Sequence, residues 1–276
     1  MKKVSILLIL LLSWKTFFAQ IDTTQQTRYI SRSTMYGAGF TNILDTYLSP
    51  LEYTGVDFRI SRENFKMTNL WDGNVSAQSF LQVNFSYTEN KPATSTALSG
   101  LANWNYALHY QFPITDNLTI LTGGLSDMNF GFIYNLRNSN NPASAKAYIN
   151  LAASAMLIYR FKIKNYPMTI RYQANLPFMG VMFSPNYQQS YYEIFTLSNY
   201  RNVIKFTSLH NQPAVRHFLS LDVPIKYSRI RFSYLWDVQQ AHVNSIKTHT
   251  YSHIFMVGYV KTIYKIKSKD SQPSVY

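Results

Sequence analysis

The stretch Tyr166–Phe178, YPMTIRYQANLPF, alternates between two kinds of side chain along its whole length. Its even positions are apolar or aromatic, whereas the odd positions include Thr169, Arg171, Gln173 and Asn175. A period of two is typical of a β-strand, because successive side chains point to opposite faces. Strands in soluble sheets are usually about 5–6 residues long. This stretch therefore predicts an unusually long strand with one apolar and one polar face.

The same alternation recurs along the chain, at residues 54–61, 81–87 and 102–112. The polar faces are rich in Asn, Gln, Ser and Arg, and the apolar faces end in aromatic residues. No window of 18 consecutive apolar residues predicts a membrane-spanning helix. Long alternating strands with aromatic ends are typical of an outer-membrane β-barrel. The alternative is a secreted soluble β-sandwich, since soluble antiparallel sheets also alternate.

The N-terminus has the pattern of a signal peptide. Lys2 and Lys3 precede a short apolar run, and Ala19 follows it as a small residue at a plausible cleavage site. The run is too short to cross a bilayer as a helix. The chain has no cysteine, which excludes disulfides, thiolate metal sites and a cysteine nucleophile. We therefore expect an exported protein with a cleavable signal peptide at 1–19.

Short turns at 113–117, 163–167 and 224–228 predict the periplasmic end of the barrel, because short turns face the periplasm and long loops face outward. Extracellular loops are then expected at 90–100, 137–147, 183–202 and 243–248. Ten strands fit these constraints, although 8 to 12 are possible. Their predicted ranges are 32–44, 53–64, 77–89, 101–113, 117–133, 146–162, 166–182, 203–223, 228–242 and 249–265. The barrel then occupies 32–265, between an N-terminal periplasmic segment at 20–31 and a flexible basic C-terminal tail at 266–276.

Hairpin geometry gives a test of this register. A turn at 164–165 places Leu157 opposite Tyr172 and Leu151 opposite Phe178, which keeps apolar side chains together on one face. A turn between residues 226 and 227 places Asp222 opposite Arg231, and Arg216 opposite Asp237. Two pairs of opposite charge on one face predict that these four residues point into the barrel.

The predicted inner face is strongly polar. Its charged network comprises Asp57, Arg59, Arg171, Arg216, Asp222, Arg231 and Asp237, and its neutral members are Asn84, Asn103, Asn105, His109, Gln111, Gln173 and Asn175. Side chains about fill a barrel of eight strands, so a ten-stranded lumen of this composition should be mostly plugged. The alternative is a narrow pore for small or anionic solutes.

Motifs for phosphate-binding loops, zinc proteases and calcium loops are absent, and neither a cofactor nor a metal site is expected. His249 and His253 are four residues apart, which on a strand separates them by about 13 Å. The segment 207–216, TSLHNQPAVR, places Ser208 and His210 on one face beside Asn211, and Pro213 predicts a bulge. These residues bear a limited resemblance to the Ser–His–Asn site of outer-membrane phospholipase A. That family reads H-x-S-N where this chain reads S-x-H-N, so none of its catalytic roles is assigned here. A lipid-modifying hydrolase is the second alternative function.

Lysine and arginine total 26 against 13 acidic residues. This excess favours outer-membrane lipid phosphates as partners. The basic residues are scattered rather than gathered into one stripe, which argues against nucleic acid. The tyrosine-rich segment 183–202 is the predicted contact surface for a protein partner, because tyrosine offers a large apolar ring with a polar tip.

Three stretches, 36–60, 210–224 and 249–260, together resemble an uncharacterised family, a domain of unknown function found in exported barrel-like proteins of Bacteroidota-type bacteria. This resemblance implies an outer-membrane location and supplies no catalytic residues. The sequence therefore favours a non-enzymatic outer-membrane β-barrel with a plugged polar lumen, acting in membrane structure or in surface interaction.

Overall fold

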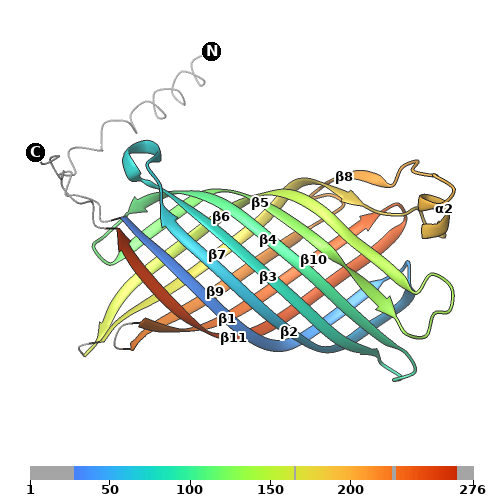
Figure 1. Ribbon diagram of the computed structural model, residues 1–276, viewed down its shortest axis with the longest axis horizontal. Coiled ribbons are helices and arrows are strands. Elements are labelled where there is room, and N and C mark those ends of the chain that lie inside the picture. The colour runs from blue at the N-terminus through green and yellow to red at the C-terminus, as the bar shows by residue number, and fades with distance from the viewer. Residues whose placement is uncertain (1–27, 165, 226–227, 266–276) are drawn as a thin grey trace, which may run out of the picture.

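The computed structural model describes residues 28–164, 166–225 and 228–265, which form a closed antiparallel β-barrel (Figure 1). Strand β1 (Arg28–Asp45) pairs with β2 (Ser49–Met67) on one side and with β11 (Ile246–Lys265) on the other. The first and last strands thus join, and the sheet closes on itself. Closure pairs the edge strands that an open sheet would leave exposed.

The remaining strands follow one another around the barrel. They are β3 (Val75–Asn90), β4 (Thr96–Pro113), β5 (Leu118–Asn135), β6 (Ala143–Ile163), β7 (Tyr166–Phe183), β8 (Ile204–Ser208), β9 (Ala214–Ile225) and β10 (Ser228–Val243). Both β8 and β9 pair with β7, so they share one place in the barrel. The barrel therefore has ten strand positions, as the sequence predicted.

The prediction of a single strand at 203–223 is wrong, because residues 209–213 interrupt it. Asn175 of β7 pairs with Arg216, whereas Met179 pairs with Ser208. The β8–β9 side therefore has four more residues than the β7 side between these two pairs. Pro213 lies at this interruption and has no N–H to donate to the ladder. The bulge predicted at Pro213 is thus larger than a single extra residue.

The barrel has two different ends. The terminal end, where β1 starts and β11 finishes, also holds the connections at 68–74 and 114–117 and the adjoining ends of β6, β7, β9 and β10 (Figure 1). The first of these contains the 3-10 helix η2 (Leu70–Gly73). The loop end holds the connections at 46–48, 91–95, 136–142, 184–203 and 244–245, with helix α2 (Tyr191–Phe195) in the longest. The three predicted short turns therefore lie at one end and the four predicted long loops at the other.

Several boundaries differ from the expected ones because the strands extend further than their alternating cores. Strand β1 starts at Arg28, inside the segment 20–31 that was expected to precede the barrel. The loops expected at 90–100, 137–147 and 243–248 are correspondingly shorter. The predicted signal peptide at 1–19 and the tail at 266–276 lie outside the described residues.

The hairpin registers are largely as predicted. Leu157 pairs with Tyr172. Asp222 pairs with Arg231, and Arg216 with Asp237. Leu151, however, pairs with Met179 rather than with Phe178, because the register shifts beside Pro177. A proline cannot donate a ladder hydrogen bond, so a bulge at this place has a low free-energy cost.

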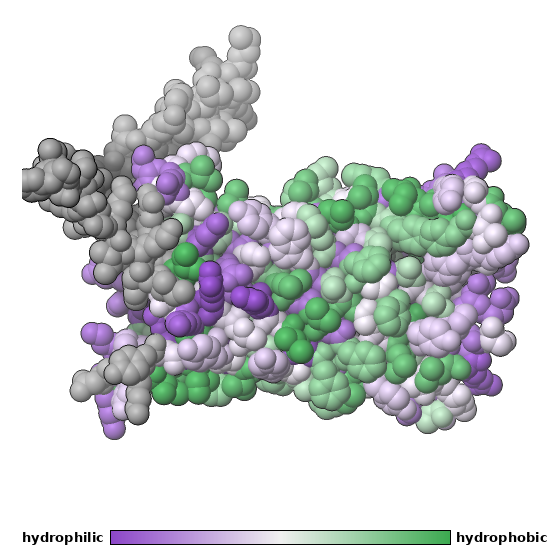
Figure 2. Space-filling view, in the orientation of Figure 1, coloured by the Kyte–Doolittle hydropathy of each residue, from purple (hydrophilic) through white to green (hydrophobic). Residues whose placement is uncertain are grey.

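The outer face of the barrel is apolar. Phe40, Phe130 and Phe255 are 72%, 73% and 69% exposed, and each belongs to the outward set of its strand. Hydrophobic residues cover much of the side of the barrel, and hydrophilic residues gather toward its ends (Figure 2). Within the described part of the chain, no helix is long and apolar enough to cross a membrane.

Candidate functional site in the barrel lumen

The structure places all seven charged residues of the predicted network on the inner face. Asp57, Arg59, Arg171, Arg216, Asp222, Arg231 and Asp237 are each at most 7% exposed. Of the predicted neutral members, Asn84, Asn103, Asn105, His109, Gln173 and Asn175 are also buried, and Gln111 is half-buried. The charged side chains form two groups at different heights in the barrel, each built from several strands.

The terminal-end layer consists of Glu63, Arg171, Asp222 and Arg231. The Arg171 Nη1 lies 2.9 Å from the Glu63 Oε1. Arg231 donates to both oxygens of Asp222, at 2.6 Å from Nε and 2.8 Å from Nη2, and its Nη1 also contacts the Glu63 carboxylate. Two guanidinium groups thus face two carboxylates. Such pairing is what allows charges to remain buried, because an unpaired buried charge is costly.

The loop-end layer consists of Asp57, Arg59, Asp127, Arg216 and Asp237. Asp237 Oδ2 lies 3.3 Å from Arg59 Nη1 and 3.1 Å from Arg216 Nη2. Arg59 also pairs with Asp57 at 3.0 Å, and Arg216 approaches Asp127 at 3.7 Å. Every charge in this layer therefore has at least one partner of opposite sign.

Two acidic members of these layers, Glu63 and Asp127, were missed in the sequence. The alternating stretch expected at 54–61 ends at Ser61, whereas the odd-numbered inner positions of β2 continue to Glu63. Asp127 pairs in register with Asn105, which was already in the predicted inner set. Extending each period-two pattern to the end of its strand is the signal that would have found both residues.

A third group of inner side chains is apolar and was not expected. Met35, Phe80, Phe218, Leu235, Ile254 and Met256 form one buried cluster. Along β9 and β10, Phe218 and Leu235 lie between the two charged layers. The Arg171 guanidinium lies 5.4 Å from the Phe218 ring centroid, a cation–π contact. The lumen is therefore filled in alternating charged and apolar layers rather than by polar residues alone.

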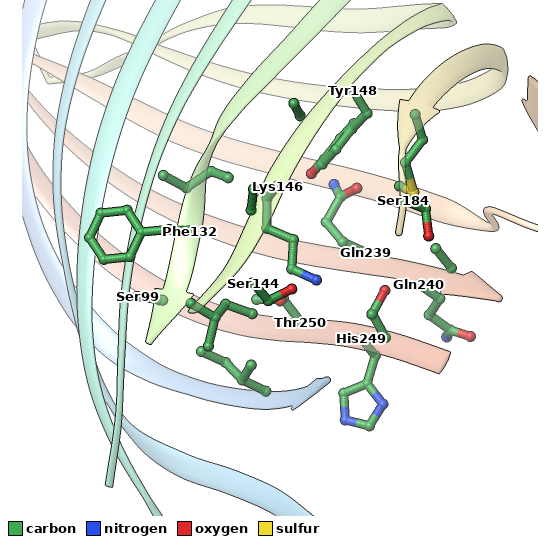
Figure 3. A pocket seen from close by; sticks show the side chains of 18 of the residues that line it. Ser99, Phe132, Ser144, Lys146, Tyr148, Ser184, Gln239, Gln240, His249 and Thr250 are labelled. Carbon is green, nitrogen blue, oxygen red and sulfur yellow. The ribbon is translucent and has the colours of Figure 1, made fainter. Parts of the chain in front are cut away.

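A small vestibule borders the loop-end layer, and Figure 3 shows Lys146, Tyr148 and Gln239 among the side chains that line it. Its volume is about 100 Å³, and Arg59, Arg216 and Asp237 are among its lining residues. Tyr148 and Lys146 of β6 also line it, and the Lys146 ammonium forms an ion pair with Asp45 at 2.7 Å. The vestibule thus combines polar groups with apolar walls and is bounded by the charged layer.

The connection 184–203 folds across this end of the barrel. The Tyr191 hydroxyl accepts a hydrogen bond from the Ala145 N–H at 2.6 Å, and the Tyr47 hydroxyl donates to the Gln189 carbonyl at 2.9 Å. Burial raises the pKa of both Tyr47 and Tyr191 above the usual range, which keeps the two phenols protonated. The Asn244 amide donates to two carbonyls of the same connection. The segment is therefore tied to three other connections or strands.

Ser208, His210 and Asn211 come together at the interruption between β8 and β9. The Ser208 Oγ lies 2.5 Å from the His210 Nδ1. Asn211, in contrast, binds backbone groups of Ser208 and Phe206. No carboxylate in the described part of the chain orients His210, and a nucleophilic serine usually needs a base that a third group holds in place. The arrangement is a local turn around one serine–histidine hydrogen bond.

His249 and His253 lie on one strand and have different partners. The His249 Nε2 lies 2.9 Å from the Asn42 Oδ1 of the neighbouring strand. The His253 Nδ1 lies 2.6 Å from the Tyr234 hydroxyl. Among the described residues, no group of three potential metal ligands comes together.

The fold and the lumen together define the class of the protein. The nine uninterrupted strands have 16 to 21 residues, and they close into a barrel that is apolar outside and largely polar inside. This is the construction of a transmembrane β-barrel. Within that class, the chain belongs to the family described as "Protein of unknown function (DUF3316)", whose model matches residues 4–270.

Several solved barrels have a related architecture. The transport unit of the autotransporter AIDA-I from Escherichia coli is 7% identical, covers 91% of this chain and 94% of its own, and gives a TM-score of 0.46. The outer membrane protease OmpT from Escherichia coli is 7% identical, covers 88% and 99%, and gives 0.41. An outer membrane channel from Pseudomonas putida F1 is 9% identical, covers 88% and 100%, and gives 0.37. No curated protein sequence matches the chain. None of these neighbours assigns a function to it.

Proposed function

We propose that the protein is a non-conducting β-barrel of the bacterial outer membrane that acts as a structural or surface-interaction scaffold. The observation that supports this most directly is the ion pair between Glu63 and Arg171, at 2.9 Å. Glu63 is on β2 and Arg171 on β7, which are five positions apart in a ring of ten. These side chains therefore meet across the full width of the lumen.

The other ion pairs support a plug in the same way. Arg59 of β2 reaches Asp237 of β10, and Arg216 of β9 reaches Asp127 of β5. Each contact joins strands that are not neighbours in the sheet. Channels that conduct water and solutes have wider barrels whose side chains leave the centre open. The narrow pore for small or anionic solutes is therefore the weaker alternative.

The outer membrane is the proposed location because the apolar outer face needs a lipid environment and the N-terminal sequence resembles a signal peptide. The loop end then faces outward. Its longest connection presents Tyr187, Tyr192 and Tyr200, which are 55%, 62% and 56% exposed. Exposed aromatic side chains on a folded support favour contact with a protein partner.

Planar-bilayer conductance of the folded protein tests the plug. We expect no discrete openings, because ion pairs between non-neighbouring strands cross the lumen in both charged layers. A double variant, Glu63→Ala with Arg171→Ala, removes the pair that spans the barrel but should stay silent as well, because the apolar cluster around Phe218 and the loop-end layer still fill the lumen. Heat-sensitive gel mobility would establish that both proteins are folded. Stable openings in the unchanged protein would replace the scaffold with the narrow-pore function.

Deletion of residues 185–200 should leave the barrel folded. Strand β9 pairs with β7 on one side and with β10 on the other, and neither ladder includes residues of this connection. Lys146 lines the vestibule beneath the segment, so its acylation by an amine-reactive reagent should become faster. Loss of heat-sensitive mobility in the deletion variant would instead make the segment part of the core. In a Lys146→Arg variant of the deletion protein the faster acylation should be absent, which would identify Lys146 as the reacting residue.

A lipid-modifying hydrolase is the second candidate, supported by the contact between Ser208 and His210. Ser208 ends β8, which pairs with the loop-end part of β7, and His210 follows it in the next turn. Lipid could approach both residues there. Release of fatty acid from mixed micelles measures this activity. Release that is lost in Ser208→Ala but retained in Ser220→Ala, a buried serine of β9, would establish it. Equal release by all three proteins would remove this candidate.

A further inference from the structure

Three rings form a row on the outer face of β9, β10 and β11. Trp236 pairs in register with His217 on one side and with His253 on the other. The ring centroids lie 5.0 Å and 6.1 Å apart, with interplanar angles of 23° and 12°. Histidine is unusual on a lipid-facing surface, because an unsatisfied polar group in hydrocarbon costs several kcal/mol. The plug and the loop surface do not account for this row.

Each histidine is held by a tyrosine. The Tyr172 hydroxyl lies 2.6 Å from the His217 Nδ1, and the Tyr234 hydroxyl lies 2.6 Å from the His253 Nδ1. If the tyrosine donates, a neutral histidine keeps a free N–H at Nε2. If the histidine donates through Nδ1, the tyrosine keeps a free O–H. Each pair therefore retains one donor in either tautomer.

Trp236 supplies a further donor. Its indole N–H has no hydrogen-bond partner among the described residues, and the residue is 41% exposed. Tryptophan can only donate through this nitrogen. The row thus presents three hydrogen-bond donors on the outer face of the barrel. A ligand of this row would have to supply hydrogen-bond acceptors.

The depth of the row indicates where those acceptors would lie. On β11 the outward side chains include Tyr259 toward the terminal end and Tyr251 toward the loop end. They are eight positions apart along the strand, which corresponds to about 20 Å along the barrel axis for tilted strands. These tyrosines mark the two edges of the apolar band. His253 is two residues from Tyr251, roughly 5 Å below the edge nearer the loops.

We propose that this row is a binding site for one ester-linked lipid of the outer leaflet. Lipid ester carbonyls accept hydrogen bonds and lie just below the headgroups, at the depth of the three donors. The acyl chains would continue along the apolar surface toward the terminal end, where Leu219, Phe232 and Phe255 are 42%, 49% and 69% exposed. The site would hold a lipid more firmly than the rest of the barrel surface.

Trp104 of β4 also faces outward, and it gives a useful contrast to Trp236. The Trp104 ring is 42% exposed, similar to Trp236, but its N–H donates to the Ser79 Oγ at 3.0 Å. Trp104 thus has the same ring and a comparable exposure with its donor already satisfied. The lipid site is predicted at Trp236 and not at Trp104.

A second copy of the chain fits this row less well than a lipid. A symmetric dimer would place the same patch against itself. The central group of each patch is a tryptophan N–H, which cannot accept a hydrogen bond. Donors would then face donors at the centre of the contact. Lipid esters, in contrast, offer only acceptors.

The test compares two vesicle compositions that differ only in the acceptor. The full-length folded protein is reconstituted with diester phosphatidylcholine or with the diether lipid of equal chain length, and retained lipid is counted by native mass spectrometry. We expect one diester molecule to be retained on the order of tenfold more tightly than the diether lipid, since three hydrogen bonds are at stake. The triple variant His217→Phe, Trp236→Phe, His253→Phe should lose this preference, and Trp104→Phe should keep it.

Equal retention of the two lipids by the unchanged protein would overturn the proposal. A dimer that disappears in the triple variant would also overturn it, because the row would then be an interface between copies. The single variant Trp236→Phe keeps an aromatic ring and removes one donor, so it should weaken the preference by about threefold. This conservative variant keeps the test decisive if the triple variant folds poorly.

Discussion

Glu63→Ala should destabilise the barrel by about 3–5 kcal/mol, the usual cost of leaving a buried charge without its partner. Glu63 accepts from Arg171 and also contacts Arg231. Arg231 would keep Asp222, but Arg171 has no other acidic partner among the ion pairs of the described residues. Urea unfolding of the protein in lipid vesicles, followed by tryptophan fluorescence, measures the loss.

Two variants show whether charge is the cause. Glu52→Ala removes a carboxylate from the same strand, but that side chain is 57% exposed, so the change should stay within about 0.5 kcal/mol. The double variant Glu63→Leu with Arg171→Met removes both charges and should recover most of the lost stability. If Glu63→Ala unfolds like Glu52→Ala, the layer does not stabilise the fold.

Much of the fold was predictable because one period governs it. An alternating pattern determines which face meets lipid, and a shift of one residue would move every side chain to the wrong face. The pairing of Asp222 with Arg231 therefore followed from the turn alone. The length of the interruption at 209–213 was not predictable. Pro213 indicates that a ladder hydrogen bond is missing, but it does not determine how many residues are unpaired.

The lumen was harder to predict than the strands. The pairs between neighbouring strands follow from register, but the contact of Glu63 with Arg171 depends on the diameter of the closed barrel. Phenylalanine occurs on both faces of the barrel, so the residue type alone does not predict which face it occupies. Phe218 is buried in the lumen while Phe232 faces outward. Likewise, the hydrogen bond between His217 and Tyr172 depends on the closed sheet.

Asp222→Ala should cost about 3 kcal/mol, toward the lower end for a broken buried pair. The change removes two hydrogen bonds to Arg231, at 2.6 Å and 2.8 Å. Arg231 then depends on Glu63, whose carboxylate already serves Arg171. The layer changes from neutral to a net positive charge among buried side chains. A lower midpoint of thermal unfolding would report this loss.

The matched control for this change is Ser220→Ala. Ser220 lies on the same face of β9 and is 1% exposed, but its hydroxyl has no hydrogen-bond partner in the described part of the chain. Its removal should therefore have little effect. Asp222→Asn retains the shape and one acceptor, so its cost separates charge from packing. An unchanged midpoint in Asp222→Ala would contradict the pairing.

A double-mutant cycle with Arg231→Met isolates the pair itself. If the two side chains stabilise the barrel through each other, the double variant should cost clearly less than the sum of the two single changes, by about 1.5–3 kcal/mol. The reason is that the first change already strands the charge that the second removes. Additive costs would mean that each residue acts through other neighbours, chiefly Glu63. The cycle thus decides whether the register of the β9–β10 hairpin or the shared carboxylate organises the layer.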